Sequence, residues 1–198
     1  MSALPVTTPI METPWTLPSR GRVGMFSLIA GETAIFTIFI IAYIYYIGKS
    51  LSGPTPQQVL AVPIFNTVCL LSSSLTIHLA VRALKRGRIA AFKLLWFLTL
   101  ALGAIFLIGT GREWYRLIYK EGLTISTNLF GTTYYSLVGL HAFHVSVGLL
   151  GLLTVMVLSL AARVNQQHAE RLDVFSLYWH FVDAVWVAVF TVVYIVGR

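Results

Sequence analysis

Hydrophobic residues of this chain gather in five long segments, and glycine, proline and charged residues gather in the short stretches between them. The segments span about 23–47, 61–84, 91–119, 130–163 and 174–197. A helix needs about 20 residues to cross the roughly 30 Å hydrocarbon core of a bilayer, and every segment reaches that length. The pattern therefore predicts an all-α membrane protein whose domain, 23–198, is a bundle of five transmembrane helices.

The last segment has the most specific pattern, because two ionisable residues lie among its apolar ones. At 100° per residue, His180 and Asp183 fall on one stripe of this helix, about 80° wide, together with two more polar side chains. An ionised aspartate deep in a bilayer costs on the order of 3 kcal/mol, so the stripe is expected to face other protein rather than lipid. Stripes of small and polar residues on the other segments favour close packing of all five helices.

Composition supports the membrane assignment. Of the 198 residues, 57% are hydrophobic and 11% are charged, whereas a soluble globular protein has about 25% charged residues. In such a chain Lys and Arg mark topology, so the net charge of +7 does not indicate a nucleic-acid partner, and none is expected. The N-terminal flank and the loops on its side hold nine Lys and Arg, and the opposite side holds five. This excess predicts a cytoplasmic N-terminus and a C-terminus outside.

Residues 1–22 are predicted to form an extended cytoplasmic arm. Four prolines lie within residues 1–19, which contain no Lys or Arg and no apolar core of a signal peptide. Proline-rich sequence of this kind favours extended backbone over helix.

Glu32 is the candidate functional group of the first segment. It lies about nine residues into the predicted helix, about 13–14 Å along its axis, and so near the middle of the bilayer. A carboxyl at that depth is a functional candidate by default. Two interpretations stay open: a proton relay, or a protonated glutamate that serves packing through a hydrogen bond.

The histidines also allow two interpretations. His141 and His144 share a helix face, and with His180 they have the number of imidazoles that a copper or zinc site needs; haem ligation is a further option. The favoured alternative is hydrogen bonding between helices, in which His180 and Asp183 meet the two histidines of the fourth segment.

Glu113 lies beside aromatic residues at the end of the third segment, where we expect a residue of the membrane interface. The sequence shows no Gly-rich phosphate loop, no GxSxG motif and no Cys–His nucleophile pair. We therefore assign no catalytic residue and no metal ligand. Polar packing between helices is the role predicted for His141, His144, His180, Asp183 and Glu113.

Four blocks of sequence resemble one known family. They are GMFSLIAGETAIF at 24–36, NTVCLLSSSLT at 66–76, EWYRLIYKEGLTISTNLFGTTYYSLVGLHAFHVSVGL at 113–149 and YWHFVDAVW at 178–186. In this order they resemble subunit III of the haem–copper terminal oxidases in its short bacterial form. The most specific feature is HxxHV followed some 35 residues later by YWHFVD. Longer members of the family have seven helices, so lipid sites that depend on the two additional helices do not carry over.

The resemblance implies an accessory subunit of a respiratory, proton-pumping oxidase that reduces dioxygen to water, with cytochrome c or quinol as the electron donor. Such a subunit holds no haem, copper or catalytic centre of its own, since these lie in partner subunits. It packs directly on subunit I, beside subunit II and in some complexes a small subunit IV, in the bacterial inner membrane. It binds phospholipid and supports proton uptake and sustained turnover. Glu32 would be the family's carbodiimide-reactive carboxyl, and Arg163 a partner of a phospholipid headgroup.

Three alternatives stay open. The chain could be the related subunit of a nitric oxide reductase complex, in which case the purified complex would have a different composition. It could be a proton-coupled membrane transporter that uses Glu32, Asp183 and the histidines. It could also be a haem-binding, quinol-oxidising membrane anchor, which predicts a visible haem band from the isolated chain.

Overall fold

The computed structural model describes residues 19–197, and within this range the chain forms helices and no strand. Five helices are long and apolar enough to cross a membrane, which confirms the predicted number of spans. They are α1 (Arg20–Tyr46), α3 (Ile64–Lys85), α4 (Ile89–Tyr119), α5 (Leu129–Leu160) and α6 (Ala169–Phe190), which continues as a π-helical stretch, η2 (Thr191–Val196). Two single turns, α2 (Pro56–Val59) and the 3₁₀ turn η1 (Gln166–His168), lie in the connections.

The predicted boundaries need three corrections. Most of the predicted N-terminal arm lies outside the described residues, but its last three residues are helical, because α1 begins at Arg20. The last helix begins at Ala169 rather than near 174, since charged residues continue its first turns beyond the apolar segment. Helix α5 ends at Leu160 rather than at 163, because Ala162 adopts a left-handed backbone conformation (φ 56°) that a helix cannot continue.

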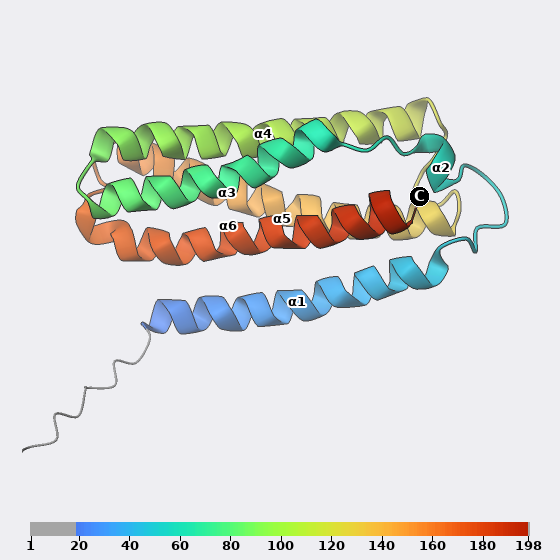
Figure 1. The fold of residues 1–198 in the computed structure, drawn as a ribbon, viewed down its shortest axis with the longest axis horizontal. Coiled ribbons are helices and arrows are strands. Elements are labelled where there is room, and N and C mark those ends of the chain that lie inside the picture. Colours follow the sequence, from blue (N-terminus) through green and yellow to red (C-terminus); the bar gives the residue numbers. More distant parts are fainter. Residues whose placement is uncertain (1–18, 198) are drawn as a thin grey trace, which may run out of the picture.

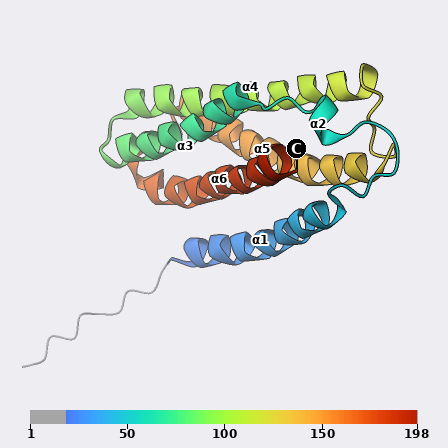
Figure 2. The ribbon, with the colours of Figure 1, turned by 45° about the vertical axis from the view of Figure 1, so that its right-hand side comes forward.

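Helices α3, α4, α5 and α6 lie side by side, and α1 lies along one flank of this group (Figures 1 and 2). Helix α1 packs against α5, α6 and η2. Only Phe36 and Tyr43 of its residues are buried. Helix α1 is therefore a peripheral element held by helices that follow it in the sequence.

The core of the bundle contains three fully buried tryptophans, and each indole has a hydrogen-bond acceptor. Trp96 donates to the Leu152 carbonyl over 2.9 Å, and Trp179 donates to the Ser73 hydroxyl over 2.8 Å. The third, Trp186, donates to the Thr67 hydroxyl over 3.1 Å. Such bonds tie α4 to α5 and α6 to α3, and they remove the cost of an unpaired donor in an apolar interior.

Glycines make room for the largest of these side chains. A Cβ atom on Gly148 of α5 would lie 2.6 Å from the Trp179 ring, and one on Gly103 of α4 would lie 2.9 Å from the same ring. Trp179 therefore fills a space that exists only because α4 and α5 carry no side chain at these positions.

One end of the bundle, which we call the basic end, carries an ion-pair cluster. Arg22 and Lys85 both contact the Asp173 carboxylate, over 2.8 Å and 2.9 Å, and so join α1, α3 and α6. The Gln166 side chain donates to the Lys85 carbonyl over 2.7 Å. At the opposite end, Arg116 donates to the Val59 carbonyl over 2.7 Å. Which end lies in the cytoplasm stays a prediction from the distribution of Lys and Arg.

Candidate functional site

Glu32 of α1 and His144 of α5 form the polar contact between these two helices. The Glu32 Oε2 atom lies 3.1 Å from the His144 Nε2 atom. The Nδ1 atom of His144 lies 2.8 Å from the Leu140 carbonyl of the same helix. A carbonyl can only accept, so Nδ1 carries a proton, and the proton between Nε2 and Oε2 is shared by the two side chains.

This arrangement can hold one exchangeable proton in two forms. Either a protonated Glu32 donates to a neutral imidazole, or a protonated imidazole donates to a carboxylate. The Glu32 side chain is 27% exposed and that of His144 is 8% exposed, so the carboxyl is the more accessible member of the pair. The geometry supports both interpretations of Glu32 that the sequence leaves open, a proton relay and a packing contact.

His141 makes no polar contact, contrary to the prediction. It is fully buried, and neither ring nitrogen has a hydrogen-bond partner among residues 19–197. Its ring lies among those of Trp186, Phe106 and Phe36, at centroid distances of 4.9, 5.7 and 6.5 Å. His141 therefore packs as an aromatic ring at the point where α1, α4, α5 and α6 meet.

His180 and Asp183 contact α3 rather than the histidines of α5, so the predicted contact between these groups is wrong. The Ser74 hydroxyl donates to the Asp183 carboxylate and lies 2.9 Å from His180 Nδ1. The physical reason lies in Trp179, which occupies the side of α6 that faces Gly148 of α5. The polar stripe is therefore turned toward α3.

The three histidines considered for a metal site lie apart in this arrangement. Among the described residues, no three or more side chains of His, Cys, Asp or Glu come together in a group that could hold a metal ion. His144 is paired with Glu32, and His180 is paired with Ser74.

Glu113 points into the bundle and makes a polar contact between helices, the role predicted for it. It accepts a hydrogen bond from the Tyr194 hydroxyl over 3.0 Å, and Tyr194 lies 3.4 Å from the Tyr134 hydroxyl. This row of polar groups connects α4, η2 and α5 at the end of the bundle opposite the basic end. Arg163 lies exposed beyond the end of α5, and its lipid contact stays a prediction.

Two functional partners were missed from the sequence. Ser74 was not singled out, although it joins His180 to Asp183. Asp173, the acid of the basic end, was not singled out; its position two residues after Arg171, at the start of the last apolar segment and on the side that holds most Lys and Arg, is the signal that could have identified it.

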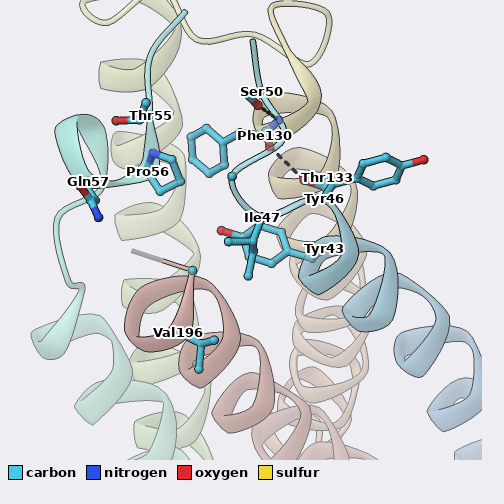
Figure 3. A pocket seen from close by; sticks show the side chains of 12 residues that line it. Tyr43, Tyr46, Ile47, Ser50, Thr55, Pro56, Gln57, Phe130, Thr133 and Val196 are labelled. Carbon is cyan, nitrogen blue, oxygen red and sulfur yellow. Dashed lines mark hydrogen bonds between the residues drawn. The ribbon is translucent and has the colours of Figure 1, made fainter. Parts of the chain in front are cut away.

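A hollow of about 290 Å³ opens at the end of the bundle opposite the basic end (Figure 3). It lies between the end of α1, the start of α5 and the end of η2. The Ser50 hydroxyl on its wall accepts from the Phe130 amide over 3.0 Å. Among residues 19–197, no Lys, Arg, Asp, Glu or His belongs to its lining.

Comparisons with known proteins agree on one family. A family model described as cytochrome c oxidase subunit III matches residues 19–198. The protein named cytochrome c oxidase subunit 3 from Bacillus sp. (strain PS3) is 36% identical over 187 residues, which cover 92% of this chain and 89% of that protein. The proteins of the same name from Alkalihalophilus pseudofirmus and Bacillus subtilis are 34% and 32% identical and cover 92% and 96% of this chain, and 90% and 94% of their own lengths.

Proposed function

The chain belongs to the cytochrome c oxidase subunit III family, and from this premise we propose that it is an accessory subunit of a proton-pumping haem–copper oxidase. In this proposal it packs on subunit I in the bacterial inner membrane, binds phospholipid, and supports proton uptake and sustained turnover. Haem and copper belong to the partner subunits. The chain's own residues supply polar contacts and proton-binding groups.

The observation that carries this proposal is the Glu32–His144 pair. Glu32 lies 12 residues after Arg20, so about 18 Å along α1, at a depth where the bilayer offers no polar partner. An imidazole that shares a proton with this carboxyl allows it to bind and release that proton without leaving an isolated charge. This is the chemistry that supply of protons to a neighbouring subunit requires.

The composition of the purified complex tests the proposal. The chain should be tagged and purified in mild detergent from the membranes of its own host. We expect it to carry with it a haem-containing subunit and a copper-containing subunit, and the complex to reduce dioxygen. A complex that reduces nitric oxide instead would favour the alternative assignment, and a chain that purifies alone would contradict both.

Glu32→Gln tests the proton role within the assembled oxidase. Glutamine keeps the size and a hydrogen bond to His144, but it cannot release a proton. We expect the initial rate of oxygen consumption to stay near that of the unmodified complex, while the rate over many turnovers falls. Oxygen uptake by the complex in liposomes measures both.

Thr37→Val is the matched control on α1, because Thr37 is exposed and its hydroxyl donates to the Thr33 carbonyl of the same helix. Immediate and complete loss of activity in an assembled Glu32→Gln complex would contradict the accessory role.

A further inference from the structure

Polar and apolar side chains together line the outward side of the contact between α3 and α6. We call this surface the α3–α6 seam. It consists of Leu71, Leu75, His78 and Arg82 of α3 with Asp173, His180 and Ala184 of α6. The four α3 residues follow a spacing of three and four, so they form one row along the helix. His78 and Arg82 of this row are exposed, and His180 is only partly buried.

The seam is polar well below the level of the lipid headgroups. His78 lies seven residues and Ser74 eleven residues before Lys85 at the basic end, so about 10 Å and 16 Å along α3. With a hydrocarbon core of roughly 30 Å, Ser74 and its partner His180 lie near the bilayer midplane. Acyl chains cannot form hydrogen bonds, and ionisable residues at this depth face protein or water.

His180 presents an unpaired acceptor on the seam. The single hydroxyl proton of Ser74 goes to Asp183, so the Ser74 oxygen accepts from His180 Nδ1–H over 2.9 Å. A neutral imidazole with its proton on Nδ1 has a lone pair on Nε2. This atom has no hydrogen-bond partner among residues 19–197. A donor from outside the described residues can therefore bind at this atom.

Positive charge exceeds negative charge at the basic end of the seam. A hollow of about 200 Å³ lies there between α3 and α6, with His78, Arg82, Lys85 and Asp173 on its walls. Asp173 is already shared by Arg22 and Lys85. Arg82 forms no salt bridge within the described part of the chain. The hollow therefore carries surplus positive charge.

We propose that the α3–α6 seam is the surface on which a transmembrane helix of a partner subunit lies. This inference rests on the proposed function, because it requires that the chain works inside an oxidase complex. The partner helix presents an N–H or O–H donor level with His180 and a carboxylate level with Arg82. A phospholipid fits less well, because its phosphate can satisfy Arg82 but its acyl chains leave His78 and His180 without partners.

Photo-crosslinking in the intact complex tests the seam. A photoreactive residue, p-benzoylphenylalanine, replaces Leu75 on the seam or Phe143 on α5. These two side chains are a matched pair, being 62% and 63% exposed and lying near the middle of their helices. Leu71 provides a second seam position if the larger residue at 75 prevents assembly.

After illumination we expect the seam variants to shift to the combined mass of this chain and one partner subunit, with the crosslink in a transmembrane peptide. The Phe143 variant should shift only by the mass of a phospholipid or detergent molecule. Phospholipid adducts alone at the seam, in a complex that retains all its subunits, would overturn the inference, and so would a crosslink to a second copy of this chain. A different result would show that the proposed function itself is wrong: the unmodified chain would purify without a haem-containing partner.

Discussion

Replacing Gly148 by leucine is expected to destabilise the bundle strongly, whereas the same substitution at Gly111 is expected to be tolerated. Even a Cβ atom at position 148 would lie 2.6 Å and 2.8 Å from the Trp179 ring. The ring cannot move away, because its indole donates to Ser73 and its other side lies against Gly103. Overpacking a core of this kind typically costs about 1–3 kcal/mol, and a leucine against a fixed indole belongs at the upper end.

Gly111 of α4 is the matched control, since a Cβ atom there meets nothing within 4 Å. Leucine at this exposed position gains up to about 1 kcal/mol of helix propensity relative to glycine. Thermal unfolding of the two variants in detergent, followed by circular dichroism, measures the difference. Equal midpoints for the two variants would show that α5 and α6 do not pack as closely as described.

The second large effect is expected from Glu32→Leu, which should loosen α1. Helix α1 buries only Phe36 and Tyr43, so polar contacts provide much of its attachment. Leucine leaves the Nε2 atom of His144 without its partner in a place where water is scarce. Removing one member of a fully buried ionic pair lowers the stability of a fold by about 3–5 kcal/mol. Because the Glu32 side chain is 27% exposed, we expect Glu32→Leu to weaken the attachment of α1 by about 2 kcal/mol.

The measurement is retention of α1 after cleavage of the loop that follows it. Residues 51–53 of this loop are exposed and lie outside the helices, so a protease can cut there. We expect the N-terminal fragment to stay bound in the unmodified protein and in Thr37→Val, and to separate during gel filtration in Glu32→Leu. Equal retention in all three would mean that apolar contacts alone hold α1.

The sequence was sufficient for the number and approximate position of the membrane spans, because hydropathy depends only on each segment. The sequence predicted the helix ends less reliably, because capping residues and ion pairs there determine where a helix begins and ends. The start of α6 is an example: Glu170 and Asp173 lie outside the apolar segment, yet they belong to the helix. Asp173 forms ion pairs with Arg22 and Lys85 on two other helices, and a hydropathy pattern carries no information about such contacts.

The partners of the polar residues were the hardest part to predict. His141 and His144 share a helix face by spacing, but three residues correspond to a rotation of about 60° between them. That angle is enough to direct His144 toward Glu32 and His141 into a group of aromatic rings. Which helix stands opposite each face depends on the packing of all five, and Trp179 with its two glycines determines much of it.

The peripheral position of α1 has a consequence for biosynthesis. Helix α1 is made before α5 and α6, the helices on which it packs. Until α5 is made, His144 is absent, and for a carboxyl without this partner in the membrane the uncharged form costs least. The contact between Glu32 and His144 can therefore form only after α5 has joined α1 in the membrane.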